Sequence, residues 1–186
     1  MSGSTRWDPR TVCLLRWTPE PERQPQMTGK DKDKENLAPD RPIIGITMGD
    51  PVGIGPEITL YALSQPSIYD ICKPLILGDI GLLSKFNASW ELGLHIQAVK
   101  SPVDGKYESG TLDVIPLSTL RLDTLQPGRP SRETGRAMVT YITQGIDLAM
   151  AGEIEGVTTC PINKHAMHKA GFPFQGHTEL LAEKTH

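Results

Sequence analysis

The sequence is poor in cysteine and has no long apolar run. Its 186 residues include three cysteines, Cys13, Cys72 and Cys160, and no CxxC pair. This spacing suits a reducing compartment better than a disulfide framework. The apolar stretches are too short for a transmembrane helix, and the run from 12 to 15 is too short for a signal-peptide core. We therefore expect a cytoplasmic protein without a membrane partner.

The sequence also lacks an excess of charge of either sign. The formal net charge is −3, which gives no electrostatic reason to expect a nucleic-acid partner. Hydrophobic residues make up 38% and charged residues 22%, as in ordinary globular proteins. A chain of this length normally folds as one domain.

The first 41 residues differ from the rest of the chain. They contain few branched apolar residues, several prolines and a mixed-charge run from 30 to 35. Such a segment buries too little apolar surface to offset its ordering entropy. We expect residues 1–41 to be a disordered leader and folding to begin at Pro42; a regulatory arm is the alternative.

Strand-like and helix-like segments alternate from Pro42 onward. The pattern predicts an α/β fold with a largely parallel sheet. In the first helix, Ile58, Tyr61, Ala62 and Gln65 fall on one mostly apolar face. The expected strands are 43–48, 74–78, 95–99, 112–117 and 156–160, and the expected helices begin at 56, 82, 131, 163 and about 178.

A glycine-rich loop, 49–55, joins the first strand to the first helix. Backbone amides and a helix start in such a loop can hold an anion, but a tight turn explains the glycines equally well. No Lys-Ser/Thr pair follows, as a P-loop requires, and Ile58 occupies the third glycine position of a dinucleotide fingerprint. Asp50 is the loop residue that could act as a base or bind a hydroxyl group.

Asn163 and Lys164 follow the strand that Pro161 ends. Residues just past the carboxyl end of a parallel strand line the ligand crevice. Lys164 could therefore neutralise a phosphate or carboxylate, or assist a proton transfer, although a solvated lysine is the alternative. A cation at a helix start opposes the helix dipole, which favours a functional role.

His165 and His168 lie three residues apart in the same predicted helix. This spacing suggests a metal site, but no HExxH pattern is present and lysines flank the pair. We favour a solvated helix face.

The segment Gly176-His177-Thr178-Glu179 combines a glycine, an imidazole and a hydroxyl at a predicted helix start. A helix cap explains Thr178 alone but leaves His177 unexplained. Both side chains can donate to the oxygens of a small anionic ligand. We therefore take His177 and Thr178 as candidate ligand-binding residues.

Three segments in order resemble the 4-hydroxythreonine-4-phosphate dehydrogenase family. They are ITMGDPVGIGPEI (46–58), SRETGRAMVTYITQGIDLAMAGEI (131–154) and TTCPINKHAMHKAGFPFQGHTELLAEKT (158–185). The resemblance implies an α/β three-layer sandwich like that of isocitrate and isopropylmalate dehydrogenases. It covers residues 42–186, the N-terminal part of a family member.

The resemblance also implies a function. Family members oxidise a phosphorylated hydroxy acid, such as 4-phosphooxy-threonine, with NAD(P) and a divalent metal (Zn, Mg or Co). Decarboxylation follows, on the route to pyridoxal phosphate. His177 and Thr178 match the substrate-binding pair, and Lys164 matches a characteristic lysine. The metal ligands and most cofactor contacts are expected beyond residue 186, and the full-length protein is expected to be a homodimer.

Three alternatives remain open. The substrate could be a threonate or erythronate phosphate. The chain could be a non-catalytic anion-binding fragment. An acyl-phosphate transferase of similar fold is also conceivable, although the GHTE and PINK segments argue against it.

Overall fold

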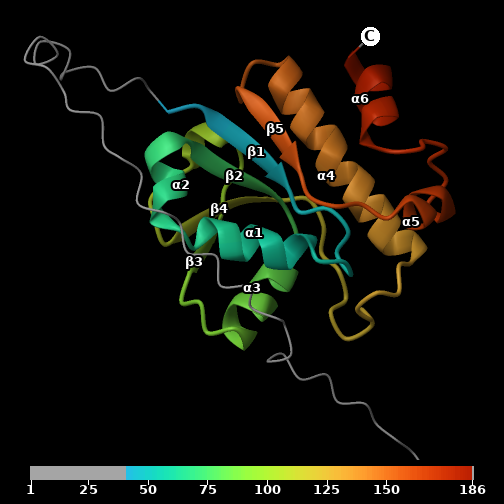
Figure 1. Ribbon diagram of the computed structural model, residues 1–186, viewed down its shortest axis with the longest axis horizontal. Coiled ribbons are helices and arrows are strands. Elements are labelled where there is room, and N and C mark those ends of the chain that lie inside the picture. Colours follow the sequence, from blue (N-terminus) through green and yellow to red (C-terminus); the bar gives the residue numbers. More distant parts are fainter. Residues whose placement is uncertain (1–40, 186) are drawn as a thin grey trace, which may run out of the picture. The chain divides into compact units, whose positions relative to one another are not determined.

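Residues 41–185 are described by a computed structural model, and they form an α/β unit (Figure 1). Strands and helices alternate along most of this part of the chain. The elements are β1 (Ile43–Thr47), α1 (Gly55–Leu63), α2 (Pro66–Ile71), β2 (Lys73–Gly78), α3 (Ile80–Ser89), β3 (His95–Ala98), η3 (Pro102–Asp104), β4 (Thr111–Pro116), α4 (Arg132–Met150), β5 (Gly156–Thr159), α5 (Lys164–Lys169) and α6 (His177–Thr185).

The strands form one parallel sheet in the order β3-β4-β2-β1-β5. β1 lies between β2 and β5, with Ile46 paired to Ile76 on one side and to Thr158 on the other. The predicted parallel α/β fold is therefore confirmed.

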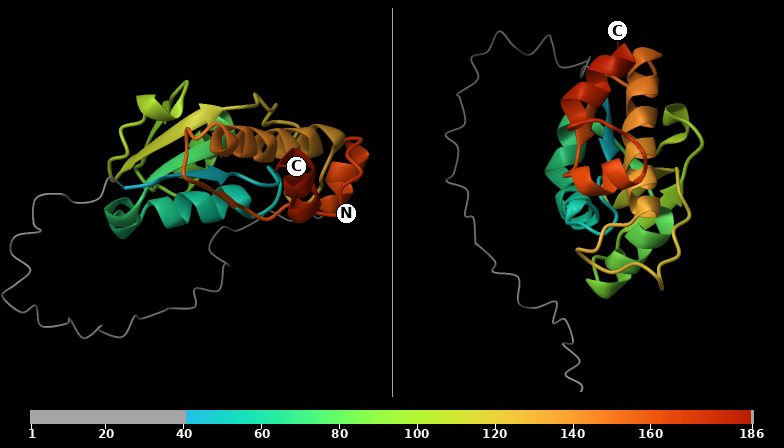
Figure 2. Two further views of the ribbon diagram at one scale, coloured as in Figure 1. Left: turned by 90° about the horizontal axis from the view of Figure 1, so that it is seen from above. Right: turned by 90° about the vertical axis from the view of Figure 1, so that its right-hand side faces the viewer.

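Helices cover both faces of the sheet. Parallel connections are right-handed, so the direction in which the chain moves across the sheet decides the face that each helix covers. α1, α2 and α3 lie on one face and α4 on the other, with α5 and α6 packed against α4 (Figure 2). The expected three-layer arrangement is confirmed.

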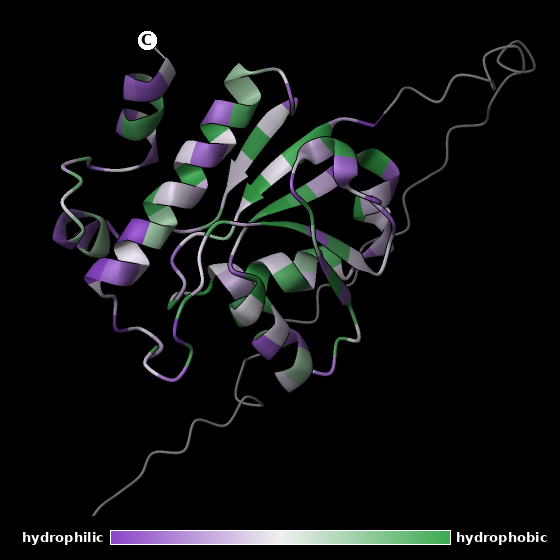
Figure 3. Ribbon diagram, turned by 180° about the vertical axis from the view of Figure 1, so that it is seen from behind, coloured by the Kyte–Doolittle hydropathy of each residue, from purple (hydrophilic) through white to green (hydrophobic). Residues whose placement is uncertain are grey.

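The core lies on both faces of the sheet, between the central strands and the helices α1, α3 and α4. The side chains of β2 are buried from Pro74 to the end of the strand, as in a strand covered on both faces. α4 is amphipathic and buries Met138, Tyr141 and Ile142 completely (Figure 3). Its N-cap is Ser131, as predicted, and the Ser131 hydroxyl accepts a hydrogen bond from the Thr134 N–H at 3.2 Å.

The apolar face predicted for α1 does not face the core. Ile58 and Tyr61 are 43% and 60% exposed, whereas Leu60 and Leu63 are buried. The buried side of α1 carries Thr59, Leu60 and Leu63 instead. The short helix α2 was not predicted.

Two further expectations concern the ends of the chain and the membrane. The predicted leader, except for its last residue, lies outside the described residues. Between residues 41 and 185, no helix combines the length and the apolar character that crossing a bilayer requires.

The order of the strands creates two places where neighbouring loops diverge. At the carboxyl ends of β1 and β5, one strand continues to α1 on one face of the sheet, and the other continues to α5, which packs against α4. The carboxyl ends of β2 and β4 diverge in the same way, toward α3 and α4. Such points are where open parallel sheets bind their ligands.

Candidate functional site

Two loops meet at the carboxyl ends of β1 and β5. The Asp50 N–H donates a hydrogen bond to the carbonyl oxygen of Pro161 at 3.0 Å. Gly49 has a positive φ of 72°, and a Cβ there would lie 2.5 Å from the same oxygen. Only glycine permits this conformation and this approach at low cost.

The helix that follows is joined to the same corner. A Cβ on Gly55 would lie 3.2 Å from the Cβ of Cys160, so the helix start fits closely against the end of β5. The Thr59 hydroxyl donates to the Gly55 carbonyl at 2.9 Å and lies 3.3 Å from the Cys160 sulfur. The glycine loop therefore acts as a tight turn that holds the start of α1 against the end of β5. This is one of the two roles considered for the loop.

Asp50 is enclosed in this corner, with 4% of its surface exposed. Its Oδ1 accepts a hydrogen bond from the Val52 N–H at 3.1 Å. Burial raises the pKa of the Asp50 carboxyl, and that hydrogen bond lowers it to a smaller extent. A carboxyl group with a raised pKa can hold or accept a proton, so the candidate role of Asp50 stays open.

α5 presents Lys164 beside the GHTE segment. Asn163 is the N-cap, and its Oδ1 accepts a hydrogen bond from the Ala166 N–H at 3.0 Å, which explains Asn163 structurally. Lys164 is exposed, and a Cβ on Gly176 would lie 3.8 Å from the Lys164 Cε. The fold thus brings Lys164 next to the residue that precedes His177.

His177 is half-buried at the start of α6. Its Nε2 atom is enclosed and has no hydrogen-bond partner within residues 41–185. Burial lowers the pKa of the ring, and a hydrogen bond to the backbone of Cys160 opposes this shift only in part. The ring is therefore neutral at neutral pH. A buried polar atom without a partner is costly, which indicates a place for a ligand group.

Thr178 and Glu179 complete the first turn of α6. Because α6 begins at His177, Thr178 lies inside the helix, and the alternative explanation of Thr178 as a helix cap does not apply. The Thr178 side chain is exposed. The Glu179 carboxylate accepts a hydrogen bond from the Gln175 N–H at 2.6 Å, which holds the turn that carries His177. This role of Glu179 was not predicted, although a glutamate near a helix start is a common signal for such a bond.

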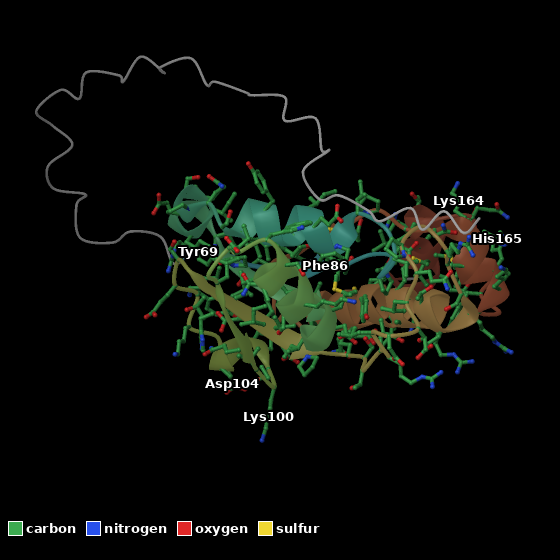
Figure 4. The ribbon with its side chains drawn as sticks, turned by 90° about the horizontal axis from the view of Figure 1, so that it is seen from below. Tyr69, Phe86, Lys100, Asp104, Lys164 and His165 are labelled. Carbon is green, nitrogen blue, oxygen red and sulfur yellow. The ribbon has the colours of Figure 1, made fainter. Side chains whose placement is uncertain are left out.

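The two histidines of α5 do not form a metal site. An Nε2–carbonyl hydrogen bond of 2.9 Å joins His168 to Phe174 and so holds the loop that leads to Gly176. His165 is exposed and lies with Lys164 at the α5 end of the molecule, far from Tyr69 (Figure 4). No group of three or more His, Cys, Asp or Glu residues in the described part of the chain is arranged to hold a metal ion.

The fold is shared with solved dehydrogenase structures. A 4-hydroxythreonine-4-phosphate dehydrogenase from Burkholderia phymatum superposes with a TM-score of 0.75 and 38% identity. The match covers 78% of this chain and 44% of that one. The architecture is therefore that of the isocitrate-dehydrogenase-like class, as the resemblance implied.

The chain belongs to the family of pyridoxal phosphate biosynthetic protein PdxA, whose model matches residues 70–186. A 4-hydroxythreonine-4-phosphate dehydrogenase from Desulforapulum autotrophicum is 50% identical over 150 residues, covering 81% of this chain and 44% of the relative. A candidate D-threonate 4-phosphate dehydrogenase from Symbiobacterium thermophilum is 44% identical over 145 residues, covering 78% and 43%. The chain thus spans less than half the length of these relatives, which are named as dehydrogenases.

Proposed function

We propose that this chain provides the substrate-binding part of a dehydrogenase that oxidises a phosphorylated hydroxy acid resembling 4-phosphooxy-threonine. Membership of a family of dehydrogenases supports this proposal. The structural observation that carries it is the enclosed, unpartnered Nε2 of His177. His177 and Thr178 both belong to the first turn of α6, and the Lys164 side chain lies next to Gly176, the residue that precedes His177.

Each of the three residues has a role in this proposal. Lys164 neutralises the phosphate or carboxylate group, and its ammonium remains accessible at the surface. Thr178 donates a hydrogen bond to a substrate oxygen. The neutral ring of His177 donates its one N–H to the backbone of Cys160, so Nε2 accepts a hydrogen bond from a substrate hydroxyl group, which gives that buried atom its missing partner.

The overall reaction is the removal of a hydride and a proton from a secondary alcohol. NAD(P) accepts the hydride, and the β-keto acid that results loses carbon dioxide. Polarisation of the alcohol oxygen is the chemistry that a divalent metal, Zn, Mg or Co, contributes in such dehydrogenases. The described residues do not form a metal site, so we assign them no step that involves a metal. Metal and cofactor ligands beyond residue 186, a homodimer and a cytoplasmic location belong to the same proposal.

A second candidate function is oxidation of D-threonate 4-phosphate. It is favoured by the relative from Symbiobacterium thermophilum, which is 44% identical to this chain. A non-catalytic anion-binding role is the third possibility. These functions differ in ligand preference and turnover, so one experiment separates them.

The test is titration calorimetry of the 186-residue chain with three compounds, 4-phosphooxy-L-threonine, D-threonate 4-phosphate and D-erythronate 4-phosphate. We expect one of them to bind, and we expect His177→Ala to weaken that binding about tenfold, since the hydrogen bond from the substrate hydroxyl group to Nε2 is lost. His165→Ala is the matched control because His165 is exposed beside Lys164 and makes no hydrogen bond within residues 41–185. Production of reduced nicotinamide with NAD and a divalent metal would establish turnover. Equal binding by the wild type and His177→Ala would refute the assigned role.

A further inference from the structure

A cavity of about 570 Å³ opens at the carboxyl end of β4. One wall is the loop 117–120, and the other is the side of α4 that carries Arg132, Arg136 and Thr140. None of Lys164, His177 and Thr178 lines it. The cavity is therefore distinct from the candidate site at the carboxyl ends of β1 and β5.

The position of the cavity suits a ligand. The chain leaves β2 toward α3 and leaves β4 toward α4, on opposite faces of the sheet. The cavity lies beside this second divergence, outside the carboxyl end of β4. Crevices at such points are where parallel α/β sheets hold small molecules, and the volume falls in the usual range for them.

One wall of the cavity is held rigidly by a buried carboxylate. Asp79 is 2% exposed and accepts hydrogen bonds from the Leu120 N–H and the Ser118 hydroxyl, each at 2.8 Å. The Ser118 hydroxyl also lies 2.5 Å from the Tyr141 hydroxyl on α4. The loop 117–120 is therefore tied to both β2 and α4, so the cavity is part of the folded structure.

The other wall carries two positive charges without partners. Arg132 and Arg136 are exposed, and within residues 41–185 their guanidinium groups make no hydrogen bond and no ion pair. Residues four apart on a helix lie one above the other, and two like charges there destabilise the helix by about 0.2–0.5 kcal/mol. Glu133 is the single acidic residue of the lining. Helix stability thus does not explain the arginine pair, whereas an anion between the two guanidinium groups does.

We propose that the cavity is a second anion site, which binds the phosphate group of a small phosphorylated molecule. Arg132 and Arg136 hold the phosphate oxygens with paired N–H donors, the geometry in which guanidinium groups bind phosphate best. Thr119 lines the cavity as well, and its exposed hydroxyl can donate to a third oxygen. The remaining volume accommodates the carbon skeleton of a small phosphate ester. This site is separate from the proposed catalytic function and does not depend on it.

The test is titration calorimetry of the 186-residue chain with glycerol 3-phosphate and with inorganic phosphate. We expect saturable binding that each of Arg132→Gln and Arg136→Gln weakens about tenfold. We expect Arg132→Lys to weaken it less, because the charge remains while the paired geometry is lost. Glu133→Gln should strengthen binding because it removes the repelling carboxylate.

Two controls make the result decisive. Arg121→Gln removes an exposed arginine just beyond the loop 117–120 that does not line the cavity, and it should leave binding unchanged. The same titrations in a His177→Ala background remove the contribution of the first site, and the dependence of binding on Arg132 and Arg136 should persist there. Arg132 and Arg136 are exposed, so their variants should unfold at the same urea concentration as the wild type. The proposal is overturned if no saturable binding occurs, if the two arginine variants bind like the wild type, or if binding depends on His177 instead.

Discussion

Gly135 lies in the second turn of α4, where α5 crosses it. A Cβ at this position would lie 2.1 Å from the carbonyl oxygen of Ala166 and 2.5 Å from its carbonyl carbon. Backbone atoms of a helix cannot move aside without moving the helix. Gly135→Ala should therefore separate α4 from α5, the helix that carries Lys164.

The expected magnitude follows from two opposing effects. Alanine is more favourable than glycine within a helix by about 1 kcal/mol. Overpacking of a close contact costs about 1–3 kcal/mol, and a rigid backbone neighbour places this case at the upper end. Gly145→Ala is the matched control in the same helix, because its Cβ would meet only side-chain methyl groups, of Leu77 at 3.1 Å and Val157 at 3.2 Å. The gain in helix propensity is the same in both variants, so the difference between their free energies of unfolding measures the cost of the backbone clash.

Urea unfolding of the two variants measures this difference. We expect the free energy of unfolding of Gly135→Ala to be lower than that of Gly145→Ala by about 2 kcal/mol. Equal midpoints and equal slopes for the two variants would show that the helices do not approach as closely as described. A change in slope alone would indicate an altered unfolded state instead.

Three further predictions concern buried polar groups. Asp79→Asn should lower the free energy of unfolding by about 2–3 kcal/mol in urea titrations, because its amide N–H₂ would face either the donors of Ser118 and Leu120 or the N–H of Leu82. An unchanged midpoint would contradict this. Because the pKa of His177 is lowered in the folded protein, the unfolded chain binds a proton more readily. The free energy of unfolding should therefore fall as the pH drops below about 6.5. A His177→Gln variant whose unfolding midpoint has the same pH dependence as the wild type would exclude His177 as the cause. Burial raises the pKa of Asp50, so the charged carboxylate destabilises the folded protein at neutral pH. Asp50→Asn removes this charge and keeps the acceptor for the Val52 N–H, so the variant should be at least as stable as the wild type at neutral pH. A lower melting temperature of the variant would refute this.

Local signals were sufficient to predict most of the fold. The strand 43–48 and the helix that follows Ser131 were recognisable because apolar periodicity, a cap and glycine signals agree there. The exposed face of α1 was not predictable, because Ile58 and Tyr61 have the periodicity of a core face. Which side of a short helix faces the sheet depends on the path of the preceding loop, and that path is fixed by contacts with a loop over a hundred residues away, at Pro161.

The candidate site was predictable in part, for a related reason. Lys164 and His177 could be selected from the sequence because each is a ligand-binding type of residue at a predicted end of a strand or start of a helix, where parallel α/β sheets bind ligands. The enclosure of Nε2 and the raised pKa of Asp50 depend on side chains that approach from distant segments, so no local pattern carries them. The sequence did not indicate a role for Arg132 and Arg136, because a serine cap and an apolar face are enough to explain a surface helix in that segment.

The two sides of α4 allow one helix to serve two separate sites. Arg132, Arg136 and Thr140 share the side that faces the cavity, whereas Gly135 lies on the side that contacts α5. α4 has 19 residues and is tied to the loop 117–120 through Tyr141, while α5 has six residues and packs mainly on α4. A clash at Gly135 should therefore displace α5 and leave α4 in place. It follows that Gly135→Ala should weaken ligand binding beside Lys164 and His177 while phosphate still binds the cavity with unchanged affinity. If Gly135→Ala weakened binding at both sites, the two sites would respond as one unit and this reasoning would be wrong.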